Sequence, residues 1–402
     1  MAGLAALAIG YVLSQFYRTF MAVLTPVLIS ELGATKADLS LASGLFFLSF
    51  ALAQFGIGVS LDRFGPRRTC SILLALCGGG GAAVFASATA PWMIMAALLL
   101  LGVGCAPVFM GSLFIFARLY ASARFAVLTS WLMAFGTAGN VIGASPLAQA
   151  AEAFGWRSVM LGLGGFTLLT AAAILLLVKD PPAPEDRAEG AAGFRGYIDL
   201  LRLKVLWPII PITAINYAPT LGIRGLWAGP YLADVYGADT LQIGDVTFFM
   251  AIAMAVGAFV YGPLDTFFRT RKWVGVIGNT VGFGALVFLA VYVDSTIPVA
   301  TAALVVIGIT GGAYGLLMAH ARAFFPPHLV GRGVTLMNFF SIGGVGVLQF
   351  ATGAVVTASD VPGDPSVQYA ALFSFYAMLL GLSVLIYLFS RDAKPVHERV
   401  SR

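Results

Sequence analysis

The sequence is short of charge. Only 10% of its 402 residues are Asp, Glu, Lys or Arg, whereas a soluble domain carries about 25%. Hydrophobic residues make up 59% of the chain, and the mean hydropathy is +0.93. A water-soluble fold could not cover so much apolar surface with so few charges. The composition therefore predicts a membrane protein.

Cysteine and histidine are also scarce, with three residues of each. Cys70, Cys77 and Cys105 lie in apolar stretches and have neither zinc-ligand nor redox spacing. The sequence contains no Walker phosphate-binding loop, so ATP cannot drive work within this chain. No His with Asp or Glu stands at membrane depth, which argues against an enzyme. We expect no cofactor, no metal and no nucleic-acid partner.

Long apolar runs predict an all-α protein with twelve membrane helices. Each run is continuous over about 20 residues, the length that crosses a bilayer, and lacks the short alternation of barrel strands. The runs cover residues 4–29, 40–61, 69–90, 92–117, 126–150, 158–178, 207–232, 243–264, 273–293, 297–320, 332–357 and 367–390. We predict two six-helix domains, 1–178 and 207–390, a polar cytoplasmic linker at 179–206 and a cytoplasmic tail at 391–402.

The positions of Lys and Arg predict the orientation. With the amino terminus in the cytoplasm, the outer loops carry only Lys36 and Arg157, and Arg18 and Arg224 lie inside spans. All but these four of the 23 basic residues then fall on the cytoplasmic side, as the positive-inside rule requires. Both termini are expected in the cytoplasm. The compact loops and the absence of a targeting extension favour a bacterial inner membrane.

The two halves of the chain are similar in sequence at an offset of about 204 residues. The loop after the second span carries Gly58, Asp62, Arg63, Gly65, Arg67 and Arg68. The corresponding loop of the second half starts with Gly262 and Asp265 and ends with Arg271 and Lys272, but Thr266 replaces the arginine. Two parallel halves of six helices are typical of carriers with a central site.

These features resemble the major facilitator superfamily over essentially the whole chain. The family loop pattern is Gly, three residues, Asp-Arg, one residue, Gly and then basic residues, which the loop after the second span matches. The resemblance implies two pseudo-symmetric bundles that rock about a central cavity. It also implies that this loop and its copy at Asp265 form a cytoplasmic latch. Gly58 is expected to allow close helix packing, and Asp62 to pair with an arginine.

Two arginines fall deep inside predicted spans, Arg18 in the first and Arg224 in the seventh. An arginine at the bilayer centre costs roughly 2.5–3.5 kcal/mol on insertion scales, so each is expected to face the bundle interior. The acidic residues can be assigned to loops, span ends or the tail, with Asp245 borderline. Guanidinium groups grip carboxylate or phosphate bidentately, so the pair predicts an anion clamp. Backbone carbonyls, Asn, Tyr or water are the alternative partners.

The spacing around Arg18 resembles the organic-anion and organophosphate antiporter branches, where an arginine precedes a proline by eight residues, as Arg18 precedes Pro26. Arg224 through Trp227 with Pro230 resembles a shortened seventh-span element of the same branches. Buried amide and aromatic donors need partners in lipid, which favours inward placement. The candidates for the same cavity are Tyr17, Trp131, Asn140, Asn216, Tyr217, Trp227, Tyr231, Tyr314, Asn338 and Gln349.

Together these features predict a monomeric secondary transporter that moves a small organic anion, a carboxylate or phosphate ester, by alternating access. No membrane carboxylate for proton coupling is evident, so anion exchange, uniport and symport all stay open. An exporter of amphiphilic or drug-like compounds is the first alternative, although the fifth span, with Gly136, Gly139 and Asn140, departs from the drug-exporter pattern. A membrane receptor or membrane-embedded enzyme is the alternative outside transport.

Overall fold

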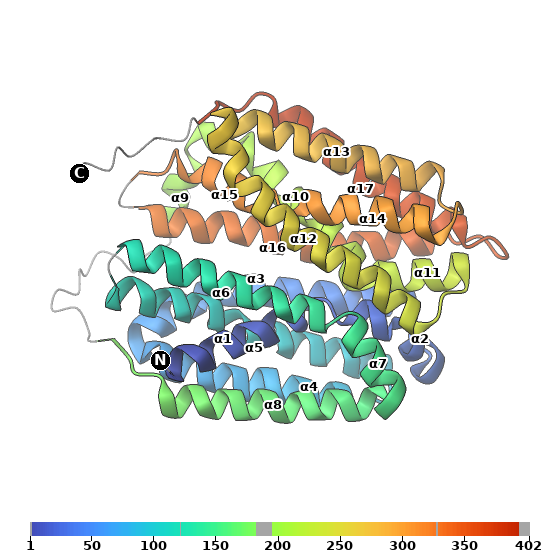
Figure 1. Cartoon of the computed structure of the whole chain (residues 1–402), viewed down its shortest axis with the longest axis horizontal. Coiled ribbons are helices and arrows are strands. Elements are labelled where there is room, and N and C mark those ends of the chain that lie inside the picture. The colour runs from blue at the N-terminus through green and yellow to red at the C-terminus, as the bar shows by residue number, and fades with distance from the viewer. Residues whose placement is uncertain (1, 121, 182–194, 327–328, 394–402) are drawn as a thin grey trace.

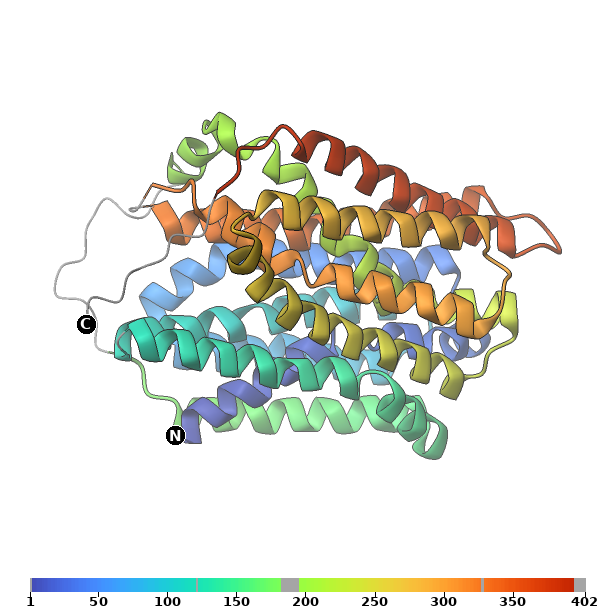
Figure 2. The same ribbon diagram turned by 45° about the horizontal axis from the view of Figure 1, so that its top comes forward.

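The computed structural model describes residues 2–120, 122–181, 195–326 and 329–393. These residues form helices and connecting turns, without a β-strand among them. In Figure 1 the first half of the chain, coloured blue to green, lies below the second half, coloured yellow to red. Figure 2 shows that the long helices of both halves run in the same general direction, as spans of one bilayer must.

The first half contains eight α-helices and one π-helical segment. They are α1 (Ala2–Phe16), α2 (Met21–Leu32), α3 (Lys36–Leu73), η1 (Leu74–Gly79), α4 (Gly80–Ala86), α5 (Pro91–Leu119), α6 (Ser122–Ile142), α7 (Ser145–Phe154) and α8 (Trp156–Leu177). The second half follows the short α9 (Arg195–Leu201) and η2 (Lys204–Leu206). It comprises α10 (Ile209–Gly222), η3 (Ile223–Trp227), α11 (Ala228–Tyr236), α12 (Thr240–Phe268), α13 (Lys272–Val291), α14 (Ile297–Gly311), α15 (Tyr314–Arg322), α16 (Val330–Ala358) and α17 (Ser366–Tyr387).

Eight of the described helices are long and apolar enough to cross a membrane, or ten if each of two bent pairs is one span. One of the eight runs over Lys36–Ala86, about twice the length that one bilayer needs. It is broken at Gly65, whose φ of +79° is favourable only for glycine, and therefore supplies two spans. Dividing Lys36–Ala86 at Gly65 raises the ten spans to eleven, and the continuous run α10–η3–α11 adds the seventh span of the chain as the twelfth. The twelve predicted helices in two six-helix bundles are thus confirmed.

The bent pairs place irregular backbone inside two spans of the first half. The axes of α1 and α2 meet at 52°, and those of α6 and α7 meet at 44°. Each bend leaves residues outside a regular helix, and broken spans of transporters commonly hold polar groups at such places. Residues 17–20 form the turn between α1 and α2, so one predicted site arginine lies at a break.

The two ends of the molecule differ in charge. The basic end holds the start of α1 and the helix α9, at the left of Figure 1. The helix ends and connections on this side of the chain's topology carry Arg63, Arg67, Arg68, Arg118 and Arg271. The acidic end holds the junctions α2–α3 and α11–α12, and carries Glu31, Asp38, Asp234, Asp239 and Asp364. Residues 182–194 of the predicted linker and 394–402 of the predicted tail lie outside the described residues, whereas α9 forms within the linker.

Candidate substrate site

Arg224 lies in the π-helical segment η3 and is 1% exposed. Its Nη2 donates a hydrogen bond to Oδ1 of Asn140 in α6, at 2.9 Å, and so joins the two halves. Its Nε is buried and has no hydrogen-bond partner among the described residues. A π-helical turn inside an α-helix is rare and is frequent at functional sites. Arg224 is therefore a buried cation whose described hydrogen bond reaches only a neutral amide.

Arg18 lies in the turn between α1 and α2, and is half-buried while Tyr17 and Thr19 beside it are buried. The central carbon of its guanidinium lies 4.4 Å from the ring centroid of Phe50 in α3. Its Nε is also buried and unpartnered within the described part of the chain. A cation over an aromatic ring is attracted by the ring's negative face but keeps its N–H donors free. Arg18 therefore still offers donors to a ligand.

The backbones that carry the two arginines lie against each other. A Cβ built on Gly225, next to Arg224, would lie 3.0 Å from the carbonyl oxygen of Arg18, closer than ordinary contact. Glycine at this position lets the first and seventh spans meet backbone to backbone. Across the described residues, no carboxylate lies within 4.0 Å of a nitrogen of either arginine. Two cations from opposite halves thus share one region without a described acidic partner.

Aromatic and amide groups from the second half complete this region. The rings of Tyr217 and Tyr314 stack at 5.0 Å between centroids, and the hydroxyl of Tyr314 donates to Oδ1 of Asn338 at 2.7 Å. The side chain of Tyr314 is close enough to interact electrostatically with the guanidinium of Arg18, and that of Tyr217 with the guanidinium of Arg224. We refer to the two arginines with Asn140, Tyr217, Tyr314 and Asn338 as the arginine cluster.

Tyr11 of α1 belongs to the same region, and the sequence reasoning missed it. It lies within electrostatic range of both Arg18 and Tyr217, and its hydroxyl accepts a hydrogen bond from Nε2 of Gln15 at 3.2 Å. Its spacing of seven residues from Arg18, which would put both on one face of an unbroken helix, was the signal that could have revealed it.

Several predicted site residues have partners inside their own half instead. The hydroxyl of Tyr17 lies 3.0 Å from that of Thr167 in α8, so this side chain is held within the first bundle. Asn216 donates to Oδ1 of Asn279 in α13 at 2.6 Å, within the second bundle. The side chain of Trp131 is 63% exposed. The structure does not bring these three into hydrogen-bond contact with the arginines.

Trp227 joins a different network near the acidic end. Its indole N–H donates to Oε1 of Gln349 at 3.1 Å and to the hydroxyl of Thr352 at 3.0 Å. The amide nitrogen of Gln349 donates to the hydroxyl of Ser43 in α3 at 3.2 Å, so this network crosses between the halves. Trp227 therefore supports the contact of α3 with α16, and its described hydrogen bonds do not reach the arginine cluster.

Polar contacts close the acidic end across the two halves. Nζ of Lys36 in α3 lies 2.5 Å from Oδ2 of Asp234 in α11, which also accepts a hydrogen bond from the hydroxyl of Tyr369. The hydroxyl of Ser145 in α7 donates to Oδ1 of Asp245 in α12 at 2.8 Å. These contacts hold the halves together at this end.

At the basic end, the described ion pairs lie within single halves. Nη2 of Arg118 in α5 lies 3.5 Å from Oδ1 of Asp62, and Nε of Arg271 lies 3.0 Å from Oδ2 of Asp265. The expected close packing at Gly58 is wrong for this conformation, because a Cβ there would meet no atom within 4 Å. Arg63 and Arg68 of the predicted latch are exposed.

An aspartate after the last span of each half holds the loop next to it, which the sequence reasoning did not foresee. The backbone N–H of Arg67 donates to Oδ1 of Asp180 at 2.8 Å. Asp392 accepts from the backbone N–H of Arg271 at 3.2 Å and of Lys272 at 3.0 Å. Burial raises the pKa of the Asp392 carboxyl, but these bonds and one from the Thr270 hydroxyl outweigh it and lower the pKa overall.

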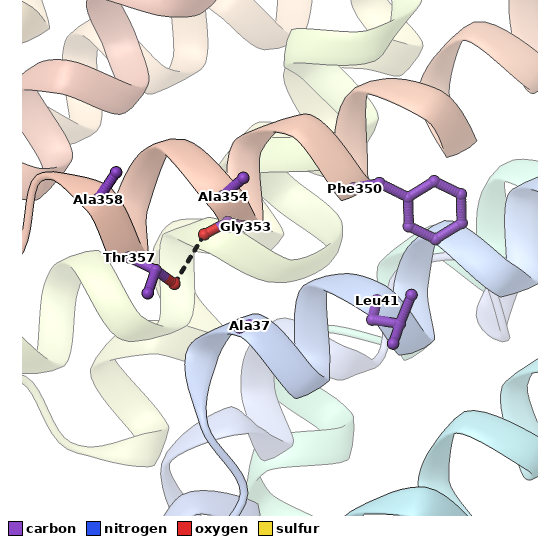
Figure 3. Close-up of a pocket in the computed structure, with 7 residues that line it drawn as sticks. All are labelled: Ala37, Leu41, Phe350, Gly353, Ala354, Thr357 and Ala358. Carbon is purple, nitrogen blue, oxygen red and sulfur yellow. Dashed lines mark hydrogen bonds between the residues drawn. The ribbon is translucent and has the colours of Figure 1, made fainter.

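A groove of about 480 Å³ lies between α3 and α16 and is shown in Figure 3. It is lined by Ala37, Leu41, Phe350, Gly353, Ala354, Thr357 and Ala358. The hydroxyl of Thr357 donates to the carbonyl oxygen of Gly353 at 2.9 Å, so it is already paired (Figure 3). This lining offers no charged group to an anion, which distinguishes the groove from the arginine cluster.

Comparison with known families identifies the class of the protein. The family model described as Major Facilitator Superfamily matches residues 7–228 and 209–402. The chain belongs to this superfamily and is a multi-pass integral membrane transporter, which confirms the resemblance found in the sequence.

Individual relatives are more distant. The sialic acid transporter NanX of Escherichia coli K12 is 23% identical over 359 residues, covering 86% of this chain and 84% of that protein. The probable sulfoacetate transporter SauU of Cupriavidus necator is 23% identical over 322 residues, covering 73% of this chain and 74% of that protein. The membrane sensor protein UhpC of Salmonella typhimurium is 25% identical over 276 residues, 63% of this chain and 61% of that protein.

Solved structures share the fold at lower identity. A bacterial homologue of the human lysosomal transporter Spinster, in an inward-facing and occupied conformation, has a TM-score of 0.79 and 18% identity, and 96% of each chain is covered. A D-xylose–proton symporter has a TM-score of 0.76 and 13% identity, with 97% of each chain covered. These structures support the twelve-helix architecture.

Proposed function

We propose that the chain transports a small organic anion, a carboxylate or a phosphate ester, by alternating access. The observation that carries this proposal is the pair Arg18 and Arg224, which come from opposite halves and meet backbone to backbone without a described carboxylate partner. Two guanidinium groups whose Nε donors are buried and unpaired in the described structure favour an anion that can accept from both. Tyr217, Tyr314 and Asn338 then supply polar contacts beside the charge.

The names of two relatives support an anionic cargo. Sialic acid and sulfoacetate each carry a carboxylate, and NanX and SauU are named for them. The shared feature is a small organic acid, which is what two arginines recognise. The likeness does not extend to one compound, so the proposal is limited to the class of substrate.

We infer a transport cycle from the contacts at the two ends. With the basic end in the cytoplasm of a bacterial inner membrane, as the positive-inside rule favours, the acidic end faces outward and is closed by Lys36 and Asp234. Substrate then exchanges through the basic end. The loop with Asp62 and Arg63 engages the second half when that end closes and the acidic end opens.

A sensor is the second candidate, and the similarity to UhpC favours it. A sensor would bind an anion at the same arginines but would not move it across the membrane. Binding and flux must therefore be measured separately.

The test uses the purified full-length protein in proteoliposomes. Uptake of labelled sialic acid, sulfoacetate and inorganic phosphate is compared with uptake of a neutral sugar, and thermal shift measures binding of the same compounds. Saturable uptake of an anion that is lost in both Arg18→Ala and Arg224→Ala supports the proposal. Binding without uptake indicates a sensor. Stabilisation by lipophilic neutral or cationic compounds alone would favour an exporter of amphiphiles and overturn the proposal.

A further inference from the structure

We propose that Asn140 occupies the place on Arg224 that a substrate carboxylate takes, so that substrate binding breaks a hydrogen bond between the two halves. The inference rests on the proposed function, because it requires an anionic cargo. It assigns Asn140 a role other than contact with substrate: the amide stands in for the anion while the site is empty.

The geometry of the guanidinium supports this role. In arginine, the N–H of Nε and one N–H of Nη2 point from the same edge of the planar group and can bind two oxygens side by side. Asn140 Oδ1 accepts from Nη2, one of the two nitrogens of this edge, at 2.9 Å, while Nε, the other nitrogen, is buried and has no partner in the described structure. One amide oxygen satisfies one of the two donors. A carboxylate or phosphate would satisfy both.

The burial and charge of the pair make the exchange favourable. Asn140 is 2% exposed and Arg224 is 1% exposed, so little water competes for the bond. Both partners of a guanidinium–carboxylate pair are charged and the pair can form two parallel N–H···O bonds, whereas an amide oxygen is neutral and here accepts a single bond. An entering anion therefore displaces the amide oxygen from the edge that carries the unpaired Nε.

The positions of the two residues couple this exchange to the relative movement of the halves. Asn140 is in α6 of the first half, near the bend to α7, and Arg224 is in η3 of the second half. When the anion replaces the amide, α6 loses its described side-chain bond to η3. Occupancy of the site thereby changes the contacts between the halves, as alternating access requires.

The test compares two substitutions with opposite expected effects, using the full-length protein and sulfoacetate, sialic acid and inorganic phosphate as probes. Asn140→Ala removes the competing acceptor, so anion affinity is expected to rise by about three- to tenfold. Asn140→Asp introduces a carboxylate that binds the whole edge, so affinity is expected to fall by more than about 100-fold. Asn279→Ala is the matched control, a buried amide in the second half that does not contact either arginine.

A second measurement follows the halves without any ligand. Spin labels at Val127→Cys in α6 and Phe267→Cys in α12, both exposed positions, report the distance between the halves. Asn140→Ala in the empty protein should shift this distance in the direction that the bound anion shifts it in the wild type. The Asn279→Ala control should leave it unchanged.

The outcomes separate the two proposals. A wild-type protein that binds none of the three anions overturns the proposed function and this inference together. Two outcomes overturn the inference alone when the wild type binds an anion. In one, anion affinity is unchanged in both Asn140 variants; in the other, Asn140→Ala weakens binding as much as Arg224→Ala does. An unchanged distance between the spin labels in the ligand-free Asn140→Ala variant also contradicts the inference.

Discussion

Arg18 and Arg224 stand on equivalent helices of the two halves, yet their surroundings differ. Arg224 is fully buried in a continuous helical run and is bonded to an amide of the other half. Arg18 is half-buried at a break between two helices and lies over the ring of Phe50. The halves are therefore related in architecture but not in chemistry. One arginine is held in place by a directional bond, whereas the other rests on a ring that allows it to move.

Replacing each arginine with lysine is expected to give the largest difference in anion affinity between the two sites. A lysine keeps the charge but loses the two-donor edge, so Arg224→Lys should reduce anion affinity by about 100-fold or more. Arg18→Lys should cost about tenfold, because an ammonium can still lie over Phe50. Dissociation constants from titration calorimetry measure both. Equal losses in the two variants would show that the arginines act alike.

The ring under Arg18 provides the next test. Phe50→Leu removes the cation–π contact, which is worth about 1 kcal/mol, and should weaken anion binding roughly fivefold. Phe47→Leu is the control, since Phe47 is a buried ring on the same helix without a contact to Arg18. Affinity that falls equally in both variants would point to general loosening of α3.

The acidic end offers a third comparison, between an ion pair that joins the two halves, Lys36 with Asp234, and one that lies within the first half, Arg157 with Glu31. Lys36→Met breaks the pair with Asp234 and should favour opening of this end by about two- to fivefold, as expected for a half-exposed ion pair. Arg157→Met breaks the pair with Glu31. Because that pair lies inside the first half, this variant should not favour opening of the acidic end.

The alkylation rate of a cysteine placed at the buried Ser43, between the halves, measures this opening. Faster alkylation in both variants would contradict a specific role for Lys36.

The smallest expected effect concerns the basic end, where the halves are alike. Asp180→Asn and Asp392→Asn each weaken the hold on a loop and should lower Tm by roughly 2 °C at pH 7. Because the folded-state pKa of Asp392 is lowered, its contribution is complete above the unfolded value of about 3.9 and is lost as pH falls through the lower folded value. The Tm difference for Asp392→Asn should therefore disappear in strong acid. A difference that persists there would contradict a role for the charge.

The sequence predicted the fold because lipid imposes simple rules on length and charge. Apolar runs predicted the spans, and the charges within them predicted that Arg18 and Arg224 lie close together, which their neighbouring backbones confirm. That these two arginines bind substrate stays a prediction. Whether a polar residue faces the other half or its own half depends on helix rotation, which composition alone does not determine. Tyr17 therefore bonds Thr167 in its own bundle, whereas Tyr11 lies near the arginines.

Contacts between distant segments were also beyond prediction. Asp180 and Asp392 follow the last span of each half, and only the folded chain brings them to loops that precede them by more than 100 residues. The open space beside Gly58 likewise depends on how the neighbouring helices are placed, which the loop motif alone does not determine.

The wide turn at η3 makes the aim of Arg224 sensitive to chain length. Each residue of an α-helix turns the chain by about 100°. Removing one residue between Leu226 and Pro230, for example Ala228, would rotate everything that follows relative to Arg224, including Gly229 and Tyr231. Insertions and deletions in this short stretch would thus change the direction of the guanidinium relative to the rest of the seventh span without changing the residue itself.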